Sequence, residues 1–154
     1  MSRHRLLKNK IIKPDPIYYN KSINILINHI MKNGKKSLAY YIIYNTLNNI
    51  CKKKKKPLFI LNKAINKVTP KLSVQTKHKC GSIFKIPIEI KSTKGKILAI
   101  RWLLTASKKR FGKNMSLKFS SELIDAAKGK GEAIRKKELI HKIAESSRTL
   151  ANFK

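Results

Sequence analysis

The sequence is poor in acidic residues. Only 7 Asp and Glu stand against 37 Lys and Arg in a chain of 154 residues, which gives a formal net charge of +30 at pH 7. So few carboxylates leave little material for a catalytic acid pair or an acidic metal site. A chain of this charge repels itself unless an anionic partner neutralises it. Nucleic acid is the partner that this balance favours.

Cysteines and long apolar runs are also scarce. The 2 cysteines, Cys51 and Cys80, are isolated, so they predict neither a disulfide framework nor a zinc site. His78 forms a single H-x-C pair with Cys80, which lacks the other ligands of a structural zinc centre. No run of about eighteen apolar residues predicts a transmembrane helix. No helix divides cleanly into basic and apolar halves, so a membrane surface is the less favoured partner.

Nucleotide-binding and catalytic motifs are missing as well. Neither G-x-x-x-x-G-K-[ST] nor G-x-G-x-x-G occurs, and the segment 33–36 supplies one of the glycines that a phosphate loop requires. Glu122 and Asp125 share one helix face, but no histidine or nucleophile is placed beside them. Helix solubility is enough to explain this pair. The sequence therefore predicts a protein that is not an enzyme and that uses no cofactor and no metal.

Lysine dominates what is present. It supplies 31 of the 37 cations, beside 22 Ile, 12 Asn and only 6 Arg. Lysine, isoleucine and asparagine have codons rich in A and T, which indicates a genome with a strong base bias. Many surface lysines are then expected to be the result of drift, so position must decide which cations bind. The run 52–56 is interpreted mainly as a solvated loop between helices, with direct contact to RNA as the alternative.

Apolar residues recur at helical spacing in six segments, which Pro, Gly and Asn residues separate. The first helix is expected to begin at Asn20 and to end at Gly34. The others are expected at about 37–51, 57–68, 97–107, 115–128 and from Glu132 onward. Five of the seven acids lie in the last two helices, so the positive face is expected elsewhere.

Between the third and fourth helices the apolar period changes from 3.6 to 2, which predicts a β-hairpin over 72–90 with a basic tip. Two strands are marginal alone, so the hairpin must rest on helices or on RNA. We expect a mainly α fold: a six-helix single domain over residues 1–154, with a protruding two-stranded β-hairpin between helices three and four. A basic N-terminal arm over residues 1–14 precedes it.

The segment Ile97–Lys113 is expected to organise the fold. Its apolar residues, Trp102 among them, cover most of a helix's circumference, which is typical of a central helix. Thr93 is a plausible N-cap. The segment ends in four cations, which exceed what one helix end can use. They predict an anionic partner and are Lys108, Lys109, Arg110 and Lys113.

Several stretches of the chain form a recognisable series in their order and spacing. They are PDPIY at 14–18, NGKKSLAY at 33–40, IEI at 88–90, RWLL at 101–104, SEL at 121–123, DAAKG at 125–129, AIRKKE at 133–138, and His141. Together they resemble the small-subunit ribosomal protein seven family in its plastid form, and the resemblance covers nearly the whole chain.

This resemblance implies binding to helical junctions of the 3-prime major domain of small-subunit rRNA, and nucleation of the head of the subunit. It also implies neighbouring head proteins as partners, no homo-oligomer, and a hairpin near the path of exit-site tRNA and mRNA. The residues it places near tRNA and mRNA are Lys79, Cys80, Gly81 and Ser82. The rRNA-binding residues it implies are Arg3, Arg5, Lys8, Lys10, Lys35, Lys36, Lys77, His78, Lys79, Lys108, Lys109, Arg110, Lys113 and Met115.

The chain departs from the family pattern at two places. Its hairpin tip, KHKCGS at 77–82, has Cys80 where the family usually has glycine, and a residue with a β carbon resists positive φ. Near the end, Ser146 and Ser147 replace the usual A-N.

The base bias and the lack of a transit peptide lead us to expect a plastid-encoded protein of the stroma, with the mitochondrion as the alternative. A free-standing basic RNA or DNA chaperone is the alternative function.

Overall fold

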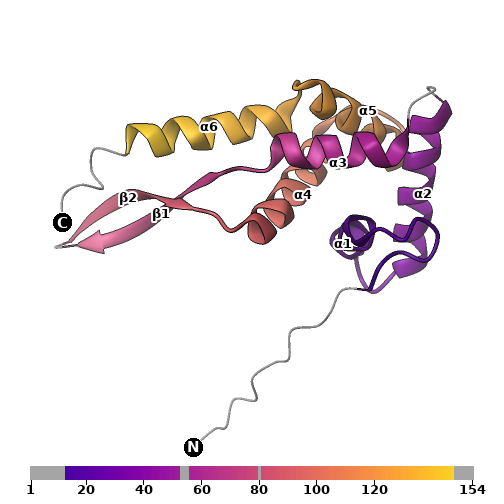
Figure 1. The fold of residues 1–154 in the computed structure, drawn as a ribbon, viewed down its shortest axis with the longest axis horizontal. Helices are drawn as coiled ribbons and strands as arrows, with labels where there is room; N and C mark the ends of the chain where they lie inside the picture. The colour runs from indigo at the N-terminus through magenta and orange to yellow at the C-terminus, as the bar shows by residue number, and fades with distance from the viewer. Residues whose placement is uncertain (1–12, 53–55, 80, 148–154) are drawn as a thin grey trace, which may run out of the picture.

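The computed structural model describes residues 13–52, 56–79 and 81–147. Over these residues the chain forms six helices and one antiparallel hairpin, placed between the third and fourth helices as the sequence predicts (Figure 1). The elements are α1 (Lys21–Ile30), α2 (Lys36–Lys52), α3 (Pro57–Val68), β1 (Leu72–Lys79), β2 (Ser82–Glu89), α4 (Ser92–Lys109), α5 (Met115–Lys128) and α6 (Glu132–Ser146).

Helix α4 is the central helix, as predicted. It contacts α1, α3, α5 and α6, and its buried residues include Ala99, Trp102 and Leu103. The predicted N-cap at Thr93 is wrong, because the helix begins two positions earlier and Lys91 is its N-cap. The helix therefore includes Gly95, which lies against the end of α3. A β carbon added to Gly95 would lie 3.0 Å from the Thr69 side chain.

The turn between α1 and α2 differs from the predicted helix end. Helix α1 stops at Ile30 with Met31 as its C-cap, so Gly34 does not terminate it. Instead Asn33 and Gly34 both adopt left-handed φ values, 51° and 71°, a conformation that glycine enters without strain. These two residues form a separate tight turn, which places Lys35 directly before α2.

The last pair of the hairpin is Lys79 with Ser82, and Gly81, directly before Ser82, has a φ of 75°. Opposed residues of an antiparallel pair share a face. Val74 pairs with Pro87 and Gln75 pairs with Ile86, so Val74 and Pro87 lie on one face of the ribbon and Ile86 lies on the other. Helix α6 contacts both strands, which confirms that the ribbon rests on a helix. The hairpin and α2 lie at opposite ends of the long axis (Figure 1).

The segment PDPIY anchors the start of the described chain to α2. Asp15 is fully buried. Its carboxylate accepts hydrogen bonds from the backbone N–H of Ile17 at 3.3 Å and of Tyr18 at 3.1 Å, and from the Tyr44 hydroxyl at 2.9 Å. The Asn24 side chain also donates to the carbonyl of Lys13. These bonds hold residues 13–18 against α1 and α2.

The Tyr44–Asp15 hydrogen bond predicts how stability depends on pH. Burial, and then the bond to Asp15, raise the pKa of Tyr44 to about 12, above an unfolded value of about 10. Its contribution to stability is therefore complete below pH ~10 and is lost as pH rises through ~12. We expect Tyr44→Phe to cost about 1–3 kcal/mol at neutral pH. In urea unfolding at pH 8 and pH 11, the difference from the wild type should shrink at the higher pH.

The matched control is Tyr41→Phe, because Tyr41 is an exposed tyrosine of the same helix. It should leave stability almost unchanged at both pH values. A Tyr44→Phe variant that loses the same free energy of unfolding at pH 8 and pH 11 would contradict the assignment.

Candidate nucleic-acid interface

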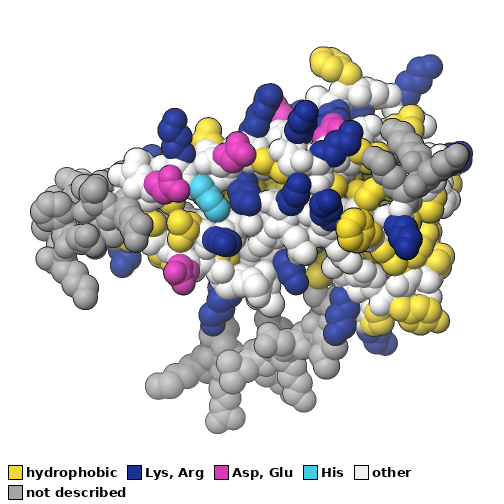
Figure 2. Space-filling view, turned by 45° about the horizontal axis from the view of Figure 1, so that its top comes forward, with side chains coloured by type: hydrophobic (Ala, Val, Ile, Leu, Met, Phe, Trp, Pro, Cys, Tyr) yellow, Lys and Arg dark blue, Asp and Glu magenta, His cyan; other side chains and the backbone are white. Residues whose placement is uncertain are grey.

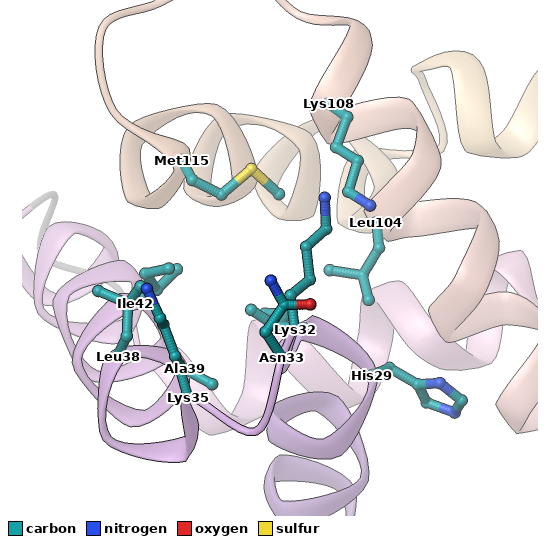
Figure 3. Close-up of a pocket in the computed structure, with 11 residues that line it drawn as sticks. His29, Lys32, Asn33, Lys35, Leu38, Ala39, Ile42, Leu104, Lys108 and Met115 are labelled. Carbon is teal, nitrogen blue, oxygen red and sulfur yellow. The ribbon is translucent and has the colours of Figure 1, made fainter.

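A groove of about 450 Å³ lies where the α1–α2 turn meets the end of α4 and the start of α5 (Figure 3). We call it the cationic groove. Its apolar lining includes Leu38, Ala39, Ile42, Leu104 and Met115, and its basic lining is Lys32, Lys35 and Lys108. With Ile30 of α1 included, the apolar lining residues belong to four helices, so the packing of the domain core fixes the positions of the lysines.

The three lysines give the cationic groove a positive charge that would suit an anion. All three are exposed, and in Figure 3 the amino groups of Lys32 and Lys108 point toward the same space beside Met115. No acidic residue of the described chain lines the groove. Lysine ammonium groups at the edge of an apolar surface suit a phosphate backbone, whose charge supplies most of the affinity of such complexes.

His29 lines the same groove without adding charge at neutral pH. Its burial, and to a smaller extent the positive charge of Arg101, lower the pKa of His29 below its ordinary value. The imidazole is therefore mainly neutral near pH 7 and can serve as a hydrogen-bond donor or acceptor. The positive potential of the groove comes from its lysines.

The predicted cluster 108–110 separates into three different environments. Lys108 lines the cationic groove. Lys109 lies 3.5 Å from Glu132 in an exposed ion pair, of a kind that contributes little to stability. Arg110 donates through Nε to Glu122 at 2.5 Å and through Nη2 to Asp125 at 2.6 Å. Only one of these three cations therefore faces the groove.

Glu122 is a structural residue, so its interpretation as a solubility residue is wrong. It is fully buried, and its second oxygen accepts the backbone N–H of Ala133 at 3.4 Å. The carboxylate thus joins the end of α4 to α5 and to the start of α6.

The same contacts keep Arg110 charged. Burial alone would lower the pKa of Arg110, but its hydrogen bonds to Asp125 and Glu122 outweigh burial, so that its pKa is raised above the ordinary value. The guanidinium therefore stays charged.

The structure groups some of the predicted RNA-binding residues and separates others. Lys35, Lys108 and Met115 meet in the cationic groove, whereas the Lys36 amino group lies 5.7 Å from the centre of the Tyr40 ring. Lys113 is exposed between α4 and α5. Sequence reasoning missed Lys32, although its place beside the Asn33–Gly34 turn was a usable signal.

The hairpin residues lie far from this groove along the molecule. Lys77 and His78 are exposed on β1, at the end of the long axis opposite α2 (Figure 1). Gly81 lies at the tip, between the paired positions Lys79 and Ser82. The other predicted positions lie outside the described residues: Arg3, Arg5, Lys8, Lys10, Cys80, and 53–55 of the lysine run.

Residues 13–52, 56–79 and 81–147 form neither a membrane-spanning helix nor a cluster of metal ligands. No helix there is long and apolar enough to cross a membrane. Within the same ranges, no group of three or more His, Cys, Asp or Glu side chains could hold a metal ion.

A basic helical domain with an acid-free groove and a projecting hairpin is typical of a protein that binds RNA by its backbone and shape. The chain matches the family model for ribosomal protein S7p/S5e over residues 2–148, and it belongs to that family. It is therefore a small-subunit ribosomal protein, of a family that is structural and not enzymatic. Membership implies binding to small-subunit rRNA and to ribosomal neighbours.

Proposed function

We propose that this chain binds a helical junction in the 3-prime major domain of small-subunit rRNA and nucleates assembly of the head. One observation carries the proposal. Lys32 and Lys35 of the α1–α2 turn and Lys108 at the end of α4 line one groove, although the two segments are far apart in the sequence. A rigid set of cations can select RNA backbones held at a particular angle, which distinguishes a junction from a straight duplex.

The hairpin provides a second, distant contact. Lys77 and His78 are exposed at the end of the molecule opposite α2, so an RNA bound in the cationic groove leaves the ribbon free to reach another strand. The tip, formed by Lys79, Cys80, Gly81 and Ser82, is the part that we propose lies near exit-site tRNA and mRNA. A β carbon placed at Gly81 would meet nothing within 4 Å, so this glycine faces open space.

Neighbouring head proteins are the partners that we propose for the exposed apolar side chains. Ile17, Tyr19 and Tyr41 are each at least 60% exposed. In Figure 2, hydrophobic side chains gather at the end of the molecule away from the hairpin. Contiguous apolar surface of this kind typically marks protein contacts. We propose that the chain acts as a single copy in the subunit.

The plastid is the location that we propose, and the mitochondrion is the alternative. The support is the composition, with its 31 Lys, 22 Ile and 12 Asn. Fractionation of the two organelles, followed by sucrose-gradient sedimentation, distinguishes them. The chain should sediment with small subunits of the plastid fraction. If it sediments with mitochondrial small subunits the location is wrong, and if it sediments apart from small subunits the assembly role is wrong.

Specific junction binding predicts the outcome of a competition experiment. At physiological salt, an unlabelled rRNA junction fragment should displace a labelled copy of itself at least tenfold more effectively than a random duplex of equal length. Non-specific affinity depends on charge alone, and the two competitors carry nearly the same charge. Equal competition would favour the alternative function, a free-standing basic RNA or DNA chaperone.

A further inference from the structure

A second groove, of about 480 Å³, lies between α3 and α5. We call it the stacking groove. Four lysines line it, and no acidic residue of the described chain does; they are Lys56, Lys63, Lys67 and Lys128. None of the four forms an ion pair within the described residues. The sequence predicts that the positive face lies away from the last two helices. Lys128, however, ends α5 and lines this groove. Figure 2 also shows basic side chains over α3 and α6.

Phe59 makes this groove different from a merely cationic surface. It projects from the first turn of α3 with 64% of its surface exposed. The Lys63 amino group lies 5.7 Å from the centre of its ring. Helix α3 begins without a side-chain cap at Lys56, so the positive end of the helix dipole adds to the charge of the lysines.

An exposed aromatic ring among lysines fits one class of partner. Single-stranded RNA offers unpaired bases that stack on aromatic rings, while its phosphates are neutralised by nearby cations. Duplex RNA keeps its base faces inside the helix and can use only the lysines. We propose that the stacking groove binds a single-stranded RNA segment, with one base stacked on Phe59 and the flanking phosphates on the four lysines.

This contact is separate from the cationic groove. Met115 lines the cationic groove and Lys128 lines the stacking groove, and they occupy opposite ends of α5. At 1.5 Å of rise per residue, these two ends are about 20 Å apart. A single phosphate contact cannot span this distance, so the stacking groove adds an RNA site whether or not the cationic groove binds a junction.

Phe59→Ala tests the proposal because it removes the ring and no charge. Fluorescence anisotropy would measure binding of the full chain to an oligouridylate of about ten nucleotides, within the range of known single-strand sites. We expect Phe59→Ala to weaken this binding about fivefold or more, since stacking of one base supplies that much. Phe59→Tyr should retain the affinity. Tyr41→Ala is the matched control, because Tyr41 is an exposed aromatic residue of α2 outside this groove.

A duplex RNA and a polyglutamate peptide of equal charge complete the experiment. Both should bind wild type and Phe59→Ala equally. An unchanged oligouridylate affinity for Phe59→Ala would overturn the proposal, and so would an equal loss for the duplex. An equal loss for polyglutamate would instead identify an acidic protein segment as the partner.

Photocrosslinking gives an independent test. A 5-iodouridine strand should crosslink to Phe59, and crosslinks confined to other peptides would also overturn the proposal. Circular dichroism melting checks that each variant is folded.

Discussion

Replacing Arg110 with alanine is expected to lower the free energy of unfolding by about 3–5 kcal/mol, the usual cost of leaving one partner of a buried ion pair alone. Glu122 is fully buried, so it would keep a desolvated negative charge or take up a proton. The end of α4 would lose its bonds to α5, and Glu122 would hold the start of α6 without its counter-charge. Urea unfolding at pH 7 measures the loss.

Lys109→Ala is the matched control for this prediction. It removes the neighbouring cation, whose ion pair with Glu132 is exposed and should contribute less than about 1 kcal/mol. The double variant Arg110→Ala/Glu122→Gln should lose less than the sum of its single variants, because each removes the charge that the other leaves unpaired. If Arg110→Ala is no more destabilising than Lys109→Ala, the structural role of Arg110 is wrong.

Replacing Lys32, Lys35 and Lys108 together with alanine is expected to cause the largest loss of RNA affinity. Each phosphate contact contributes roughly 0.7–0.9 to the slope of log affinity against log salt. Three lost contacts should therefore flatten the slope by about 2–3 and lower affinity for the junction fragment on the order of 100-fold near physiological salt. Filter binding across a salt titration measures both quantities.

The control triple replaces Lys94, Lys130 and Lys142 with alanine. These lysines are exposed, lie in three different segments and do not line the cationic groove. The control removes the same formal charge, and we expect it to reduce affinity by much less. Equal slopes and equal losses for the two triples would mean that total charge, and not the groove, binds the RNA.

Local patterns predicted the elements of this fold because the signals that form them are local. The apolar period of 3.6 located the helices, the change to 2 located the hairpin, and the apolar circumference around Trp102 identified the central helix. The details at element ends were harder to predict. The end of α1 depends on the tight turn at Asn33 and Gly34, and the start of α4 depends on how closely Gly95 can approach α3.

The candidate site was less predictable than the fold, because it depends on the directions of side chains around a helix and on ion-pair partners that are distant in sequence. Successive residues of a helix are rotated by about 100°, so Lys108, Lys109 and Arg110 cannot share a face although they are adjacent in sequence. The carboxylates that bind Arg110 lie in the following helix. The sequence predicts an anionic partner for this surplus charge, but two of these three cations pair with carboxylates within the protein.

The long-range construction of the cationic groove also affects how the chain behaves during its own synthesis. Residues from His29 to Met115 line the groove, and the carboxylates that hold Arg110 are added later still. A nascent chain that has emerged only as far as α3 therefore carries much of its positive charge but no assembled groove. At roughly 5–20 residues per second, several seconds pass in this state. Under the proposed function, the nascent chain would therefore hold RNA by charge alone until α5 has emerged and packed, and would select among RNA shapes only afterwards.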